Sequence, residues 1–143
     1  MNKFAVLVDG SDPSMRAAKY TAELASAVGA TVEIIHVMNL ESRLNAVSTL
    51  KSDYTPTVVL EESRAEGRQI LEEAKALFLE TTEVHLRLAT GRPVEKILAF
   101  CQEIQPDLVV VGARGLGGIK GAVMGSLSTA LLENMTCPIL IIK

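Results

Sequence analysis

The sequence has few cysteines and few aromatic residues, and both shortages exclude kinds of fold. Of its 143 residues, two are cysteine, none is tryptophan and 3% are aromatic. Two cysteines are too few for a disulfide-rich scaffold, and they form no CxxC pair. Cys101 lies in a helical apolar stripe and Cys137 precedes Pro138 at a strand entry, so we interpret both as small buried hydrophobes. The core must therefore be built from Val, Ile, Leu, Ala and Met.

Long apolar runs and excess positive charge are also lacking. No apolar segment approaches the roughly 20 residues that would cross a bilayer, and the N-terminus enters a strand-like run at residues 3–8 without the features of a secretory signal. We therefore expect a cytoplasmic protein without a membrane partner. A formal net charge of -3 argues against a broad nucleic-acid surface. It does not exclude a single nucleotide, because backbone N–H groups can hold phosphate without formal charge.

Five short apolar runs alternate with helical patterns along the chain. Apolar residues make up 48% of the sequence and charged residues 22%, which is typical of an ordered domain, and we expect one domain over residues 1–143. The apolar runs are residues 3–8, 32–38, 83–89, 108–112 and 138–142, and the four helical stripes begin near Met15, Gly67, Val94 and Leu127. Strands that alternate with helices predict a parallel sheet with helices on both faces.

Two of the runs have the pattern of strands at a sheet edge. In residues 83–88, His85 and Arg87 alternate with apolar residues, and we interpret His85 as a solvated edge side chain. Ile139–Ile142 is the other candidate edge but is apolar throughout. Because an uncovered apolar edge promotes aggregation, we predict that it pairs with a second copy in a symmetric dimer. The alternative is that helices alone cover it. His36, in a half-buried strand, is interpreted as structural.

The segments that precede the helices contain capping residues and one long connection. Asp12-Pro13 predicts a helix capped by Asp12, and Gly91-Arg92-Pro93 opens a later helix similarly. Residues 39–57 have weak periodicity and follow a strand. Loops of such length are uncommon in compact domains and are often lids or binding loops. We therefore expect a loop here, on the side of the sheet where open α/β proteins bind ligands.

Six of the ten glycines fall between residues 112 and 125, in a segment that leaves a strand and enters a helix. Glycines there let a ligand approach the backbone, and the helix N-terminus offers N–H donors to an anion. The Ser126 hydroxyl can meet a phosphate oxygen, and Arg114 and Lys120 supply positive charge. The alternative is a flexible glycine loop without a ligand. No frame supplies the Walker A motif GxxxxGK[ST], and the dinucleotide motif GxGxxG fails because Lys120 occupies its last glycine position.

The spacing of Gly112, Gly115 and Gly125-Ser126 resembles the ATP-binding signature G-2x-G-9x-G-[ST] of the universal stress protein family. Further segments resemble the family in the same order, namely Val6 to Ser11, His36-Val37, Gly91-Arg92-Pro93, Asp107 to Gly112 and Cys137 to Ile142. The resemblance implies an adenine nucleotide alpha hydrolase-like fold. This is an open, doubly wound sheet of five parallel strands in the order 3-2-1-4-5, with helices on both faces. It also implies a homodimer through the last strand.

The resemblance further implies a site for ATP, or for ADP or AMP, with Mg²⁺ held mainly by the phosphates. The implied contacts are Val8, Asp9, Val37, Gly112, Arg114, Gly115, Gly125, Ser126, Leu127 and Ser128. Among them, Val37 would contact adenine, and Gly125 and Ser126 would hold the phosphate tail. Independently of the resemblance, Asp9, Val37 and Gly112 all end predicted parallel strands and should line one crevice. Asp9 could instead be a turn former.

The resemblance implies a nucleotide-dependent sensor or regulatory module, acting in the stress response through its loop and dimer state on an unknown downstream protein. The alternative is a slow ATPase or an autophosphorylating enzyme. Asp9 is the one strand-end acid that we can nominate for hydrolysis, so we expect at most weak turnover. A receiver domain is disfavoured because the third strand ends in Ala89-Thr90-Gly91 without an acceptor Asp. An adenylating ligase is disfavoured because no SGGxDS-like or HIGH-like loop follows the first strand.

Overall fold

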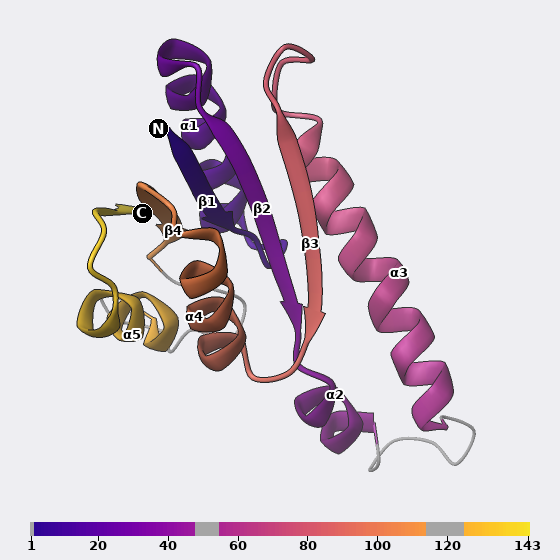
Figure 1. The fold of residues 1–143 in the computed structure, drawn as a ribbon. Helices are drawn as coiled ribbons and strands as arrows, with labels where there is room; N and C mark the ends of the chain where they lie inside the picture. Colours follow the sequence, from indigo (N-terminus) through magenta and orange to yellow (C-terminus); the bar gives the residue numbers. More distant parts are fainter. Residues whose placement is uncertain (1, 48–54, 114–124) are drawn as a thin grey trace.

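The fold was analysed in a computed structural model that describes residues 2–47, 55–113 and 125–143. Strands and helices alternate along most of the chain (Figure 1). In chain order they are β1 (Lys3–Leu7), α1 (Asp12–Val28), β2 (Thr31–Met38), α2 (Leu40–Val47), α3 (Pro56–Lys75), β3 (Val84–Thr90), α4 (Pro93–Ile104), β4 (Leu108–Gly112), α5 (Ser126–Asn134) and β5 (Ile139–Ile142).

The strands form one parallel sheet in the order β3-β2-β1-β4-β5, as predicted. Helices α1 and α3 pack on one face of the sheet, and α4 and α5 pack on the other. Consecutive side chains on a strand point to opposite faces, so the inner strands contribute to two cores. Val6 and Ile34 pack in the core under α1 and α3, whereas Ala5 and Ile35 pack in the core under α4 and α5.

Both cysteines belong to the core on the α4 and α5 side. Cys101 on α4 is 2% exposed, and burial raises the pKa of its thiol to about 11. Cys137, half-buried before β5, has a thiol pKa that burial also raises. Both side chains therefore stay protonated at neutral pH and pack as apolar groups. This confirms the interpretation of Cys101 as a small buried hydrophobe, whereas Cys137 is only half-buried.

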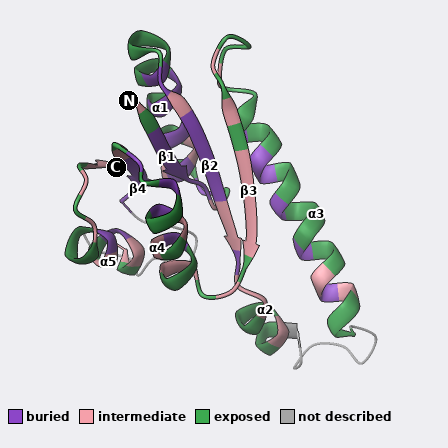
Figure 2. Ribbon diagram, viewed as in Figure 1, coloured by how far each residue is buried: buried purple, intermediate pink, exposed green. Residues whose placement is uncertain are grey.

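Helix α3 lies close to the sheet because residue 67 has no side chain (Figure 2 shows the buried stripe of this helix). A Cβ at Gly67 would lie 2.8 Å from Leu88 Cδ1 and 3.0 Å from His36 Cδ2. The His36 ring below the helix has its Nδ1 2.7 Å from the carbonyl oxygen of Val8. Since a carbonyl can only accept, Nδ1 donates this bond. His36 thus links the ends of β1 and β2, which agrees with a structural role.

The start of α1 differs from the prediction. Ser11, not Asp12, is the N-cap, and its side chain accepts from the backbone N–H of Ser14. Asp12 is the first helical residue. The helix begins there because Asp9 Oδ1 accepts from the backbone N–H and the hydroxyl of Ser11, at 2.9 and 2.5 Å, in a turn where Gly10 has φ of 84°. The assignment of the cap to Asp12 was therefore wrong by one residue.

The long loop expected at residues 39–57 is largely helical in the described part. Asn39 Oδ1 accepts from the backbone N–H of Ser42 at 3.1 Å at the start of α2. Thr55 caps α3 in the same way, and Pro56 is the first residue of that helix. Residues 48–54 lie outside the described residues. Helix α2 escaped the periodicity analysis because it is short and mostly exposed.

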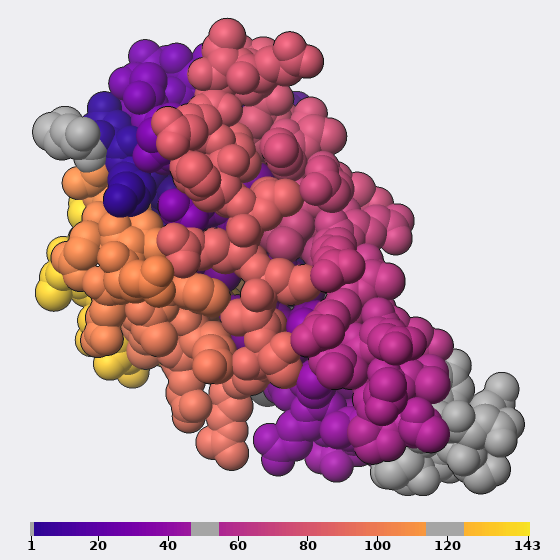
Figure 3. All heavy atoms as spheres, turned by 45° about the vertical axis from the view of Figure 1, so that its right-hand side comes forward, coloured from indigo at the N-terminus to yellow at the C-terminus, as the bar shows by residue number. Residues whose placement is uncertain are grey.

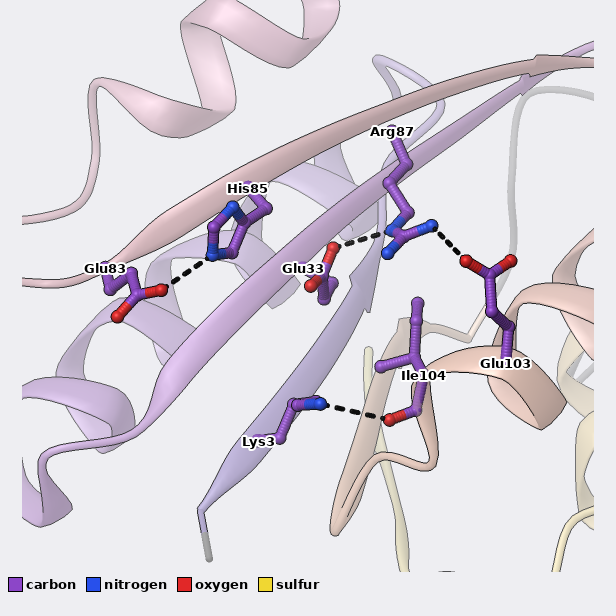
Figure 4. A network of polar contacts seen from close by, with 7 residues as sticks. All are labelled: Lys3, Glu33, Glu83, His85, Arg87, Glu103 and Ile104. Carbon is purple, nitrogen blue, oxygen red and sulfur yellow. Dashed lines mark hydrogen bonds and ion pairs between the residues drawn. The ribbon is translucent and has the colours of Figure 1, made fainter.

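Strands β3 and β5 are the two edge strands of the sheet, as predicted. The polar face of β3 carries an ion-pair network (Figure 4). Arg87 Nε donates to Glu33 on β2 at 2.7 Å, and its Nη1 donates to Glu103 on α4 at 3.2 Å. The bond to Glu33 raises the pKa of Arg87, although burial opposes this shift. His85 is exposed, as expected, and pairs with Glu83 at 2.8 Å.

The two acidic partners of Arg87 differ in burial, which predicts different costs of removing them. The Glu33 side chain is 10% exposed and the Glu103 side chain 66%. Glu33→Ala removes the buried partner and should lower the free energy of unfolding by about 2 kcal/mol. Glu103→Ala removes an exposed partner and should cost about 0.5 kcal/mol or less. Urea unfolding of both variants measures the difference, and equal losses would contradict a buried role for the Glu33 pair.

Candidate functional site

The carboxyl ends of β1, β2 and β4 lie on the same side of the molecule, because these strands are parallel neighbours in the sheet. The structure brings together here the strand ends that carry Asp9, Val37 and Gly112. Their surroundings differ, however. Val8 is buried on the α1 and α3 side, whereas the half-buried Val37 packs toward α4. The two valines therefore point to opposite faces, and a ligand that contacts Val37 lies on the α4 and α5 side.

Asp9 forms the turn between β1 and α1. Its Oδ1 accepts both bonds from Ser11, and its backbone N–H donates to Ser14 Oγ at 3.2 Å. Ser14 Oγ in turn donates to the carbonyl of Ser11 at 3.0 Å. This geometry is that of the turn-forming Asp considered in the sequence analysis. Ser11 and Ser14 were not selected from the sequence. Their signal was the S-x-x-S spacing around Pro13, which fits a helix cap.

Gly112, the last residue of β4, is in contact with the first turn of α1. A Cβ at this position would lie 3.0 Å from the backbone carbon and Cβ of Pro13 and from the backbone nitrogen of Ser14. Any larger residue would push the helix away from the strand. The glycine thereby lets the positive end of the α1 dipole lie at the carboxyl end of β4.

Ser128 fixes the start of α5 to the same strand. Its side chain is almost fully buried, and its hydroxyl lies 2.9 Å from the carbonyl oxygen of Gly112 and 3.2 Å from that of Ala113. The backbone N–H of Gly125 also donates to the Ala113 carbonyl at 2.6 Å. These contacts join the two ends of the glycine-rich segment at the carboxyl end of β4. The Ser128 hydroxyl therefore serves to anchor α5.

The first turn of α5 presents a helix N-terminus without a side-chain cap. Gly125 is the N-cap residue and has no side chain to accept a bond. Ser126 follows as the first helical residue and is exposed, while the half-buried Leu127 packs into the core on this face. Uncapped N–H groups and the helix dipole favour an anion at such a place. Arg114, Gly115 and Lys120 lie outside the described residues.

The part of the chain that the structure describes contains neither a candidate metal site nor a candidate membrane-spanning helix. Over residues 2–47, 55–113 and 125–143, no group of three or more His, Cys, Asp or Glu side chains is arranged to hold a metal ion. In the same ranges, no helix is both long enough and apolar enough to span a bilayer. The N-termini of α1 and α5 lie together at the carboxyl end of β4.

The sheet order and the helix N-termini at its carboxyl edge define an open, doubly wound α/β protein. The model of the universal stress protein family matches residues 1–143. Universal stress protein YxiE of Bacillus subtilis is 35% identical over 147 residues, which cover 99% of both chains. The chain therefore belongs to the universal stress protein family.

Solved structures of universal stress proteins share the fold. UspA from Lactobacillus plantarum aligns with a TM-score of 0.75 at 20% identity, covering 99% of this chain and 97% of that one. A universal stress protein solved in complex with cAMP aligns at 26% identity with a TM-score of 0.64, covering 99% and 96% of the two chains. One from Archaeoglobus fulgidus in complex with dAMP aligns at 21% identity with a TM-score of 0.70, covering 100% and 98%.

The contact between Gly112 and α1 predicts that Gly112→Ala is destabilising. The new Cβ would force the backbone of Pro13 and Ser14 to shift, so the free energy of unfolding should fall by about 1–3 kcal/mol. Ser126→Ala, at an exposed position on the neighbouring helix, is the control and should change it by less than about 0.5 kcal/mol. Denaturant unfolding followed by circular dichroism compares the two. Similar stability of both variants would show that α1 is not held against β4 through residue 112.

Proposed function

We propose that the protein binds ATP or another adenine nucleotide at the carboxyl edge of its sheet and acts as a cytoplasmic, nucleotide-dependent regulatory module in the stress response. The observation that carries this proposal is the meeting of two helix N-termini, those of α1 and α5, at the end of β4. Both dipoles favour negative charge there. The G-2x-G-9x-G-[ST] spacing spans the same place, and related proteins have been solved with cAMP and dAMP.

Each part of the crevice has a role in this proposal. Gly125 and Ser126 bind the phosphates through the N–H groups of α5 and the exposed serine hydroxyl. Gly115 and Arg114 contact the ribose and phosphates from the segment between β4 and α5. Val37 packs against adenine on the α4 side, Gly112 borders the ribose and phosphates, and Leu127 and Ser128 lie beside the phosphate tail. Mg²⁺ accompanies the nucleotide with the phosphates as its main ligands.

Binding is favoured over hydrolysis by the position of Asp9. A phosphoryl-transfer enzyme needs a placed base and carboxylates that hold its metal. Asp9 is the strand-end acid at the crevice, and its Oδ1 already accepts two bonds from Ser11. The nucleotide therefore acts by stabilising the conformation and assembly state that bind it, since a ligand shifts an equilibrium toward the state it prefers.

The assembly state in this proposal is a homodimer through β5. Ile139, Leu140 and Ile141 are only half-buried at this end of the sheet. On α1, which also contacts β5, Tyr20, Leu24 and Val28 are exposed at a spacing of four residues. Arg16, on the preceding turn of that stripe, donates from Nε to the carbonyl of Lys143 just after β5. The strand edge and the helix stripe together form an apolar surface that a second copy can cover.

The nucleotide site can be tested by substitution of its glycine. Gly115→Val places a side chain where ribose or phosphate belongs, and should weaken ATP binding at least tenfold with little change in stability. Isothermal titration calorimetry with ATP, ADP and AMP measures the affinities. Glu133→Ala, at an exposed position on the last turn of α5, is the matched control and should bind as the wild type does. Retained affinity in Gly115→Val would contradict the assignment of the glycine-rich segment. Turnover of tens per second that is lost in Asp9→Asn would favour an enzyme instead.

The dimer can be tested by placing a charge on β5. Ile141→Asp buries a carboxylate in the proposed interface and should convert the protein to a monomer at micromolar concentration, because an unpaired buried charge is costly. Sedimentation velocity measures the assembly state, and circular dichroism verifies that the variant is folded. Leu79→Asp, at an exposed apolar residue beyond α3, is the control and should leave the dimer intact. A folded variant with an unchanged oligomer would reject pairing through β5.

A further inference from the structure

A groove of about 430 Å³ lies between α3 and β3, at the end of the sheet opposite β5 (Figure 3 brings this side of the molecule forward). Its lining residues are Met38, Arg64, Arg68, Leu71, Glu72, Leu86, Leu88, Ala89 and Thr90. None of them belongs to the nucleotide site proposed above. The groove opens on the α3 side of the sheet, whereas Val37 packs toward α4. It is therefore a separate surface.

One wall of the groove is a strand whose outer side is unpaired within the described residues, because β3 ends the sheet. The carbonyl of Glu83 accepts from Val32, and the N–H of Gly91 donates to the carbonyl of Met38. Residues that bond to β2 alternate along a parallel strand with residues that bond outward. The N–H and C=O groups of Leu86, Leu88 and Thr90 therefore point away from β2, and these residues line the groove.

The other wall is α3, which contributes charge as well as apolar surface. Arg64 and Arg68 are one turn apart and exposed, and neither forms an ion pair within the described residues. Leu71 lies beside them and contributes to the apolar floor together with Leu86. The groove thus combines an apolar floor, two available guanidinium groups and a row of backbone donors and acceptors.

The two walls have matching lengths. From Leu86 to Thr90, β3 extends about 13 Å at roughly 3.3 Å per residue. From Arg64 to Glu72, α3 extends about 12 Å at 1.5 Å per residue. Backbone groups that recur on alternate residues over this length match an extended peptide, which offers donors and acceptors at the same spacing. A compact small molecule does not offer donors and acceptors in such a row.

We propose that β3 and α3 form a docking site for an extended acidic segment of a partner protein, which adds to the sheet as a strand beside β3. Its backbone bonds to the outward groups of Leu86, Leu88 and Thr90, its apolar side chains pack on the floor, and its acidic side chains pair with Arg64 and Arg68. The occupant is not a second copy of β3, because the sequence VHLRLAT contains no acidic residue for these arginines. A nucleic acid is disfavoured because two arginines are far fewer positive charges than a phosphate backbone needs, whereas they can pair with two acidic side chains of a peptide.

The proposal predicts which peptides bind. A displayed library of random octapeptides is selected against the full-length wild-type chain, with nucleotide absent. Enriched sequences should alternate apolar and acidic residues, and the best synthetic peptide should bind at least tenfold more weakly to Arg64→Glu/Arg68→Glu. Arg68→Glu is also compared with Lys19→Glu, a reversal of an exposed cation on α1 that should leave binding unchanged. Failure to enrich any peptide, enrichment without acidic residues, or equal loss in both single variants would overturn the proposal.

Strand addition can be distinguished from side-chain contact alone by N-methylation of the peptide. Only alternate residues of an added strand bond to β3, so two peptides methylated on opposite sets of amides should differ. One should lose binding at least tenfold, and the other should bind nearly as the parent does. In ¹⁵N NMR spectra, the parent should slow solvent exchange at the N–H groups of Leu86 and Leu88. Equal effects of the two methylation patterns, or unchanged exchange at these amides, would overturn strand addition.

Discussion

The backbone of α1 touches the end of β4 because residue 112 is a glycine. With a Cβ 3.0 Å from Pro13 and from Ser14, any other residue would separate helix from strand. Much of the crevice depends on this approach. The turn made by Asp9 and Ser11 leads into the same helix end, and the Gly112 carbonyl accepts the hydroxyl of Ser128 that anchors α5. The missing side chain at residue 112 thus lets the N-terminus of α1 lie against β4, and the backbone carbonyl of the same residue anchors α5. Packing against α1 is therefore reason enough for a glycine at this position.

An element of this structure is predictable from the sequence when many residues form one pattern that indicates it. The inner strands were predictable because continuous apolar runs have few uses other than burial on both faces. The sheet order followed from the edge patterns of β3 and β5 together with the family resemblance, and the structure confirms it. The cap of α1 and the short helix α2 were predicted incorrectly. Each depends on one or two hydrogen bonds, from the N–H of Ser14 to the side chain of Ser11 and from the N–H of Ser42 to the side chain of Asn39, rather than on a periodic pattern.

The candidate site was predictable as a place but less so in its details. Alternation of strands and helices brings the ends of β1, β2 and β4 to one edge, so the region followed from topology. The directions of individual side chains did not. Val8 and Val37 lie on neighbouring strands but face opposite sides, and Ser128 turns into the protein instead of outward. The groove beside β3 had no sequence signal, because Arg64 and Leu86 are distant in sequence and come together only when α3 packs on the sheet.

The hydrogen bond from the Gly125 N–H to the Ala113 carbonyl joins the two residues that flank the glycine-rich segment 114–124. Both ends of residues 114–124 are attached to β4 and α5 by contacts that lie outside that segment. The entropic cost of closing a loop, expressed as free energy, rises by only about 0.6 kcal/mol for each doubling of its length. Insertions or deletions between these anchors should therefore leave the sheet nearly as stable. In this architecture, the length of the glycine-rich segment can change separately from the fold.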